Sequence, residues 1–268
     1  EAYYQAKKKL FDRPELRYMI LNVDSPYGQR LAREALSPAP QIWVGAQGRE
    51  IVLKRCVPKF GGTEVVIETP IGTLEVLIPL IGTFQIHNLL AVIAVLWLKG
   101  VSLSAIQAWL LTLKTVRGRM ECIHQKPLIV IDYAHTPDGL EKALQAFRPY
   151  VAGNLWVLFG CGGDRDKTKR PLMARIAEQY ADHVIVSSDN PRSESLEPIF
   201  EDIKSGFQAP QRVLWLASRE SAVTYACQQL GPQDGLLLAG KGHETTEERQ
   251  GVFIPADEVA WVRRALNT

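Results

Sequence analysis

The sequence WVLFGCGGDRDK at residues 156–167 passes from an apolar run directly into a glycine-rich, charged loop. The same order returns at residues 184–194, where VIV is followed by SSDNPRSE. Short apolar runs of this kind are typical of buried strands. In an open α/β sheet, the loops at the carboxyl ends of the strands converge on a ligand crevice. We therefore expect the polar side chains of both loops to lie near one spot: Asp164, Arg165, Asp189, Asn190 and Arg192.

This set of side chains indicates a small ligand that carries charges of both signs. Guanidiniums suit a carboxylate, and neighbouring acceptors suit an ammonium. The glycines of 160–163 allow a phosphate to approach the backbone, but no Gly-x-Gly-x-x-Gly or Walker A sequence is present in the chain. The cationic side chains that follow are predicted to form a solvated face: Lys167, Lys169 and Arg170.

The remainder of residues 117–268 repeats the same alternation of strand and helix. Strands are expected at 128–132, 154–159, 183–187, 212–216 and 235–239, and helices at 137–150, 170–181, 195–206, 218–230 and 256–266. Thr136 and Pro137 are typical of an N-cap and a first helical position. This alternation predicts an α/β fold, with a mostly parallel, Rossmann-like sheet covered by helices.

Residues 1–116 have a different pattern. A helix end is expected around residues 3–10, a strand at 18–23 and a helix start at Asp24-Ser25-Pro26. Short β-rich runs between 50 and 78, separated by glycines and a proline, predict a small antiparallel meander. Helices are expected at 86–99 and 102–113, and the helical pattern ends at 114–118. We place the domain boundary there, with domains at 1–116 and 117–268.

Composition limits the class of protein. The net charge of +2 gives no reason to expect nucleic acid as a partner. The four cysteines are widely spaced, which argues against a zinc ribbon or a disulfide framework and suits a reducing compartment. The longest apolar run, at 89–98, is too short to span a bilayer, so no membrane association is expected.

Several other motifs carry polar groups at positions suited to chemistry. Asp132 ends a strand, where its carboxylate suits a ribose hydroxyl; the alternative is a helix cap with a packing tyrosine and a surface His135. Glu244, in the loop 240–244, suits an ammonium; the alternative is an ordinary turn with exposed charges. Arg117 and Arg119 suit phosphate or an interface with acidic groups.

Two further candidates lie in the first part of the chain. Lys7 is one of three consecutive lysines, which depress one another's pKa but are ordinarily a solvated helix end. Asn88 is placed just before an apolar helix, where asparagine is more often a cap than a ligand.

These motifs together resemble the ATP-dependent Mur ligases of peptidoglycan synthesis, over nearly the whole chain. The most specific pieces are 132–137, 160–171, 189–192 and 240–244. The Asp-Asn-Pro-Arg sequence at 189–192 is similar to that of members that add meso-diaminopimelate rather than lysine. The resemblance implies an ATP-dependent amide ligase that works through an acyl phosphate, with ATP and Mg²⁺ as cofactors. Its implied partners are a UDP-N-acetylmuramoyl dipeptide and meso-diaminopimelate, and it implies a cytoplasmic enzyme, which we expect to be a monomer.

The resemblance also assigns roles to individual residues. It implies that Lys7 is carbamylated and holds a magnesium ion, and that the nucleotide is bound by Asn88, Arg119, Asp132 and His135. The diaminopimelate contacts that it implies are Arg165, Asp189, Asn190, Arg192, Gly240 and Glu244. Departures from the family pattern are Phe84-Gln85, where a phenylalanine-asparagine pair is common, and the run 245–247, which lacks an aromatic residue.

The family's phosphate loop and UDP-sugar domain have no counterpart in these residues. We therefore expect the chain to be an inactive fragment, comprising the later half of a central ATPase domain and a complete amino-acid-binding domain. Two alternatives remain from the sequence. One is a nucleotide- or amino-acid-binding module without catalysis, and the other is a related ligase of the folylpolyglutamate synthase type.

Overall fold

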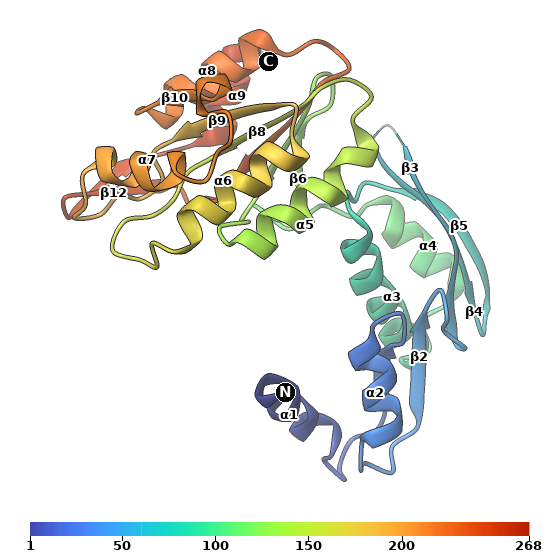
Figure 1. Ribbon diagram of the computed structural model, residues 1–268. Coiled ribbons are helices and arrows are strands. Elements are labelled where there is room, and N and C mark those ends of the chain that lie inside the picture. Colours follow the sequence, from blue (N-terminus) through green and yellow to red (C-terminus); the bar gives the residue numbers. More distant parts are fainter. Residues whose placement is uncertain (60, 268) are drawn as a thin grey trace. The chain divides into compact units, whose positions relative to one another are not determined.

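The computed structural model describes residues 1–59 and 61–267 and divides into two compact units, Glu1–Lys114 and Thr115–Thr268 (Figure 1). The first unit is built on one mixed sheet in the order β1-β2-β3-β4-β5. β1 to β3 run parallel, and β3 to β5 form an antiparallel meander. The bounds of these strands are β1 Met19–Asn22, β2 Gln41–Gly45, β3 Ile51–Lys59, β4 Gly62–Thr69 and β5 Gly72–Ile78.

Four helices complete the described part of this unit: α1 Ala2–Phe11, α2 Pro26–Glu34, α3 Thr83–Leu98 and α4 Leu103–Leu111. The meander alternates along its strands, so that Val65, Ile67 and Leu74 point into one core, which they share with α3 and α4. Helix α3 is apolar around most of its circumference, which explains the length of its hydrophobic run.

The elements of this unit match the sequence pattern in part. The helix start at Ser25 and Pro26 and the meander are confirmed. Helix α4 is capped by Ser102, whose Oγ accepts from Ala105 N. Strand β2 was not predicted, since its five residues lack strict alternation and follow a proline-rich segment. Helix α3 begins three residues earlier than expected, at Thr83, so the interpretation of Asn88 as a helix cap is wrong.

The second unit contains a six-stranded sheet in the order β10-β9-β8-β11-β7-β6. The first five strands of that order are mutually parallel, and β6 joins the edge antiparallel. Strand bounds are β6 Glu121–His124, β7 Leu128–Asp132, β8 Leu155–Phe159, β9 His183–Ser187, β10 Leu214–Leu216 and β11 Gly235–Ala239. The expected α/β fold with a mostly parallel sheet is confirmed; β6, a short edge strand, was not predicted.

Helices cover this sheet, as its strand composition requires. β11 is apolar and buried along its whole length, which is typical of a strand covered on both faces. Apolar residues of α8 and α9, including Val223 and Val262, share one core with Ile131 and Leu158 of the sheet. The helices have the bounds α5 Pro137–Phe147, α6 Lys169–Tyr180, α7 Leu196–Lys204, α8 Arg219–Gln229 and α9 Glu258–Leu266.

An antiparallel hairpin of β12 Thr246–Arg249 and β13 Val252–Pro255 stands apart from the main sheet. It follows the loop after β11 and bonds to the loop after β9: Arg192 N donates to Glu248 O at 3.0 Å, and Gln250 N donates to Arg192 O at 2.7 Å. The hairpin was not predicted from sequence, because its first strand is almost entirely charged. Among the described residues, no helix has the length and apolar character needed to cross a membrane.

Candidate functional site

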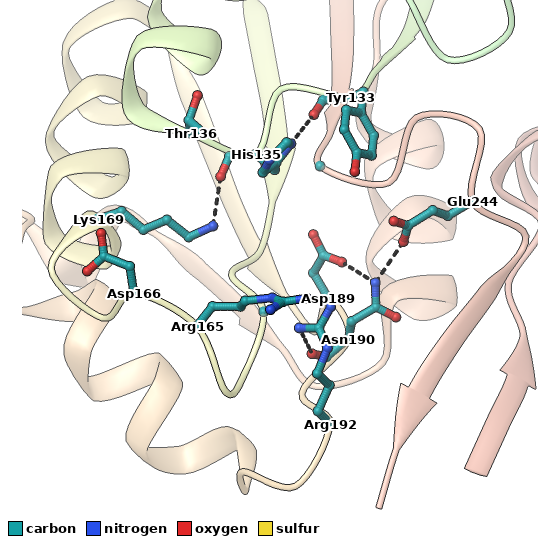
Figure 2. Close-up of a pocket in the computed structure, with 12 residues that line it drawn as sticks. Tyr133, His135, Thr136, Arg165, Asp166, Lys169, Asp189, Asn190, Arg192 and Glu244 are labelled. Carbon is teal, nitrogen blue, oxygen red and sulfur yellow. Dashed lines mark hydrogen bonds between the residues drawn. The ribbon is translucent and has the colours of Figure 1, made fainter. Parts of the chain in front are cut away.

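A cavity of about 460 Å³ lies within the second unit, at the carboxyl ends of its parallel strands. Four loops line it, those that follow β7, β8, β9 and β11. Figure 2 shows side chains from these loops, with the amide of Asn190 directed at Asp189 and Glu244. The lining residues are Tyr133, His135, Thr136, Gly162, Arg165, Asp166, Lys169, Asp189, Asn190, Arg192, Gly240 and Glu244. The parallel order of the sheet causes this convergence, since neighbouring parallel strands end at the same edge.

The loop after β9 has a strained backbone. Asn190 has a φ of 44° and Arg192 a φ of 54°, in the left-handed region that few residues other than glycine adopt. Strain of this kind persists only where the surroundings fix it, and it clusters at functional sites. Here the hairpin fixes it, because Asn190 Oδ1 accepts a bond from Glu248 N at 2.9 Å in addition to the backbone bonds of Arg192.

The side-chain amide of Asn190 also bonds to two carboxylates of the cavity lining. Its Nδ2 donates to Glu244 Oε2 at 2.7 Å and to Asp189 Oδ1 at 3.3 Å (Figure 2). The loop after β9 and the loop after β11 are therefore joined through one amide. The arrangement places both carboxylates on the same side of the cavity, where they form a negative patch.

Arg192 supplies the opposite charge. Its Nη1 donates to Gly163 O at 2.8 Å, and its Nε lies 3.5 Å from Glu248 Oε2. These contacts use part of the planar fork and leave the side chain about one quarter exposed. Arg165 is exposed and lines the same cavity from the loop after β8. Two guanidiniums thus border a cavity that also contains two carboxylates.

The glycines of the loop after β8 permit its close approach to the loop after β9. A Cβ on Gly163 would stand 1.9 Å from Pro191 O, and one on Gly160 would stand 2.4 Å from Ser187 O. Gly163 N donates to Asn190 O at 3.0 Å, which joins the two backbones. Packing between these loops accounts for glycine at both positions.

Arg170 corrects the prediction of a solvated cationic face. Its side chain is fully buried at the start of α6, where it pairs with Glu194 at 3.0 Å and with Asp202 at 2.8 Å. It also donates to Gly162 O at 3.1 Å, and so supports the glycine loop from below. Lys169 lines the cavity and donates to His135 O at 2.8 Å, so only Lys167 remains mostly exposed. Helical periodicity could have predicted this burial, because it places Arg170 on the same face of α6 as the apolar Met173 and Ala174.

Asp132 lies beside the cavity rather than in its lining. Its two oxygens accept backbone bonds from Met120 N at 2.8 Å and Ala134 N at 2.9 Å, and burial raises the pKa of the carboxyl group. The cap of α5 is Thr136, which accepts from Gly139 N. His135 is an exposed residue of the lining, and its Nδ1 lies 2.8 Å from Tyr133 O.

An aromatic cluster extends from this region. The guanidinium of Arg119 lies 4.7 Å from the centre of the Tyr133 ring. That ring also contacts the imidazoles of His135 and His243, at 4.6 and 5.5 Å between centres. The sequence analysis missed Tyr133 as a lining residue, although its position directly after β7 was a usable signal.

The candidates of the first unit lie on its helices. Lys7 is exposed on α1, with its ammonium 5.3 Å from the Tyr3 ring. Asn88 is exposed on α3, next to His87, whose Nε2 lies 3.4 Å from Asp24 Oδ2. No cluster of three or more His, Cys, Asp or Glu side chains suited to a metal occurs in residues 1–59 and 61–267.

Sequence models of two domains from one protein family together match most of this chain. The Mur ligase middle domain matches residues 1–96, and the glutamate ligase domain of Mur ligases matches residues 118–242. The chain belongs to the Mur ligase family. The cavity of this Mur ligase chain is lined largely by residues of the second match.

Two relatives of known name agree with this membership. The UDP-N-acetylmuramoyl-L-alanyl-D-glutamate–2,6-diaminopimelate ligase of Pseudomonas aeruginosa is 44% identical, over 99% of this chain and 55% of its own length. The enzyme of the same name from Coxiella burnetii is 39% identical, over 99% of this chain and 56% of its own. The Mur ligase chain thus spans about half the length of these curated relatives.

Solved structures extend the comparison. A structure of a UDP-N-acetylmuramoyl-L-alanyl-D-glutamate–2,6-diaminopimelate ligase has a TM-score of 0.73 and 33% identity, over 99% of this chain and 56% of its own. A Mycobacterium tuberculosis folylpolyglutamate synthase, complexed with ADP and AMPPCP, has a TM-score of 0.67 over 89% of this chain and 56% of its own. Its identity of 22% shows a shared fold alone.

The ion pair of the buried Arg170 with the half-buried Glu194 predicts a pH dependence of stability. The guanidinium lowers the pKa of Glu194 from its ordinary 4.5 to about 2. A depressed carboxyl pKa contributes stability above the unfolded value, and this is lost as the pH falls from about 4.5 to about 2. We expect Glu194→Gln to reduce the free energy of unfolding at pH 7 by at most about 2 kcal/mol, after screening. It should also flatten the decline of stability in that acid window.

Urea unfolding of wild type and variant at several pH values measures this effect. Glu197→Gln, an exposed carboxylate of the same segment, is the matched control and should follow the wild type. Parallel acid profiles for wild type and Glu194→Gln would contradict the role of this pair.

Proposed function

We propose that the protein is an ATP-dependent ligase that joins meso-diaminopimelate to the D-glutamyl carboxylate of UDP-N-acetylmuramoyl-L-alanyl-D-glutamate, in peptidoglycan synthesis. The observation that carries the proposal is the single cavity bordered by Arg165 and Arg192 on one hand and by Asp189 and Glu244 on the other. The names of the relatives, which cover almost the whole chain, support the same substrate.

The chemistry of diaminopimelate fits this arrangement. The molecule has an ammonium and a carboxylate at each end, whereas lysine lacks the second carboxylate. Guanidiniums bind carboxylates through two parallel bonds, and carboxylates receive ammonium groups. A site built to pair a charged group rejects an analogue that lacks this group, because the arginine is then left unpaired. We assign this choice to Arg192, with Gly240 and the amide of Asn190 shaping the wall of the pocket.

The proposed reaction has two steps. ATP transfers its terminal phosphoryl group to the D-glutamyl carboxylate, which gives an acyl phosphate and ADP. The neutral amine of diaminopimelate then attacks the acyl carbon, the bond to phosphate breaks, and phosphate leaves with the bonding electrons. The nitrogen releases one proton to water, which gives the amide. The residues of this chain hold the amino acid and orient its amine, which supplies a large part of the rate in reactions of this kind. Exclusion of water protects the acyl phosphate from hydrolysis.

The remaining candidates are proposed to serve the nucleotide and the metal. Asn88, Arg119, Asp132 and His135 are proposed nucleotide contacts. A carbamate on Lys7 would be anionic and offer oxygen to Mg²⁺, which neutralises phosphate charge when bound. The exposure of Lys7 leaves room for the modification. The lack of an acidic cluster in the described residues fits an ion held mainly by phosphates, water and one or two protein oxygens.

An amino-acid panel tests the proposed function directly. The purified full-length protein is given ATP, Mg²⁺ and the UDP-linked dipeptide, with meso-diaminopimelate, L-lysine or L-glutamate as the acceptor. We expect phosphate release and a UDP-linked tripeptide with meso-diaminopimelate alone. Preference for L-glutamate would favour a ligase of the folylpolyglutamate synthase type, and binding without turnover would favour a module without catalysis.

Arg192 provides the sharpest mutational test. Arg192→Ala should raise the KM for meso-diaminopimelate by roughly one and a half to three and a half decades, since losing a buried charge pair costs about 2–5 kcal/mol. The KM for ATP should stay nearly constant. Arg192→Lys should also be poor, because an ammonium cannot reproduce the planar fork. Arg175→Ala, which removes an exposed arginine of α6, is the control. Equal changes for both substrates would indicate general destabilisation instead.

Lys7→Ala tests the metal proposal in the full-length protein. Activity should fall by at least about 100-fold, because an oxygen ligand that positions Mg²⁺ is lost. An added short carboxylic acid should restore part of it by standing in for the carbamate. Lys9→Ala, on the same exposed helix end, should retain wild-type turnover. Wild-type rates for Lys7→Ala at low Mg²⁺ and low bicarbonate would remove Lys7 from the mechanism.

A further inference from the structure

Lys241 lies buried directly beneath the cavity. Its side chain is completely inaccessible to solvent, which is rare for lysine unless the ammonium is paired. The Nζ donates to Thr246 O at 2.9 Å. The flanking glycines, Gly240 with a φ of 112° and Gly242 with a φ of 55°, give the backbone the turn that aims this side chain inward. The sequence alternative of an exposed charge in an ordinary turn is therefore wrong for Lys241.

The buried ammonium faces both carboxylates of the cavity. It lies 3.9 Å from Asp189 Oδ1 and 3.9 Å from Glu244 Oε2. The amide of Asn190 donates through Nδ2 to the same two oxygens, Asp189 Oδ1 and Glu244 Oε2. The ammonium of Lys241 and the amide of Asn190 thus both contact the two carboxylates of the negative patch.

Electrostatics explains why a cation is needed at this position. Two carboxylates that share a site repel each other, and a cation close to both offsets that repulsion. Asp189 is also nearly buried, with only 8% of its side chain exposed, so water offers its charge little stabilisation. Burial lowers the pKa of Lys241, while the charge of Asp189 opposes that shift and favours the ammonium.

Packing adds a geometric constraint to this charge balance. A Cβ on Gly240 would stand 2.5 Å from Asp189 Oδ2, so the carboxylate rests against bare backbone. Behind it, Arg219 is buried as well, and donates to Glu258 at 2.7 Å and to Ala239 O at 2.7 Å. Arg219 already has a close acidic partner of its own, whereas the acids within 4 Å of Lys241 are the two that line the cavity.

We propose that Lys241 is a positioning residue for the amino-acid pocket, a buried cation that offsets the charge of Asp189 and Glu244 and holds both carboxylates in place for the ammonium of the ligand. This inference rests on the proposed function, because it assigns to Lys241 the shape and charge of the diaminopimelate site. Lys241 touches no substrate itself. It acts through the two carboxylates that do.

The first test removes the positive charge of Lys241 and keeps a side chain of similar volume. In the full-length protein, Lys241→Met should raise the KM for meso-diaminopimelate roughly 10- to 100-fold, since removing one partner of a buried ion pair leaves the other uncompensated. The KM for ATP should change less than about twofold, and kcat should change less than the KM for the amino acid. Lys204→Met, an exposed lysine of α7, is the matched control. An unchanged KM for diaminopimelate would overturn the proposal.

A double-mutant cycle separates this role from simple packing. Asp189→Asn removes the carboxylate that Lys241 compensates, so adding Lys241→Met to it should raise the KM by less than about threefold. A full additional 10- to 100-fold loss would show that Lys241 serves packing alone, which would refute the inference. If Lys241→Met does not fold, recovery of folded protein in the double variant supports the pairing, and failure of both variants opposes it.

The wild-type panel keeps the two proposals distinguishable. If wild type does not ligate diaminopimelate, the proposed function fails, and the cycle is then measured on urea unfolding of the 268-residue chain. Coupling between positions 189 and 241 in that measurement supports the buried pairing independently of substrate. If wild type ligates diaminopimelate and the cycle shows no coupling, the inference about Lys241 fails alone.

Discussion

The site depends on the contact between the loops that follow two adjacent parallel strands, β8 and β9. These loops touch backbone to backbone, with Gly163 N bonded to Asn190 O and no space for a side chain between Gly163 and Pro191. Arg192 then reaches across to Gly163 O. Once this contact exists, the positions of Arg192 and Asp189 follow from short backbone segments, and the amide of Asn190 bonds to Glu244 of the loop after β11.

Buried charge stabilises this arrangement from below. Arg170 supports the glycine loop through Gly162, and Lys241 lies under Asp189 and Glu244. Each cation is fully buried, which is costly unless acidic partners are held close by. The apolar strand β11, buried along its whole length, supplies the rigid surroundings in which such pairs keep their geometry. A site of paired charges on a rigid sheet is suited to selecting a ligand by the position of its own charges.

Much of the fold was predictable because it is local. The strands with continuous apolar runs, the helices with one apolar face, the helix start at Ser25 and the cap at Thr136 were all recognised from short patterns. The elements that were missed are β2, β6 and the β12–β13 hairpin. They are short or charged, and pairing with a neighbouring strand, rather than their own composition, makes them strands.

The sequence alone determined which polar residues follow which strands, and hence that 165, 189–192, 240 and 244 gather at one edge of a parallel sheet. It also determined the resemblance to Mur ligases, because each motif that carries it is a contiguous stretch of residues. The tertiary structure decided which charged side chains are buried and paired and which are exposed. Arg170 and Lys241 are buried and paired, while Lys167 is mostly exposed, although all three are cations in or directly after glycine-containing loops. Burial depends on residues distant in the chain, such as Asp202 for Arg170 and Asp189 for Lys241, and no local pattern contains that information.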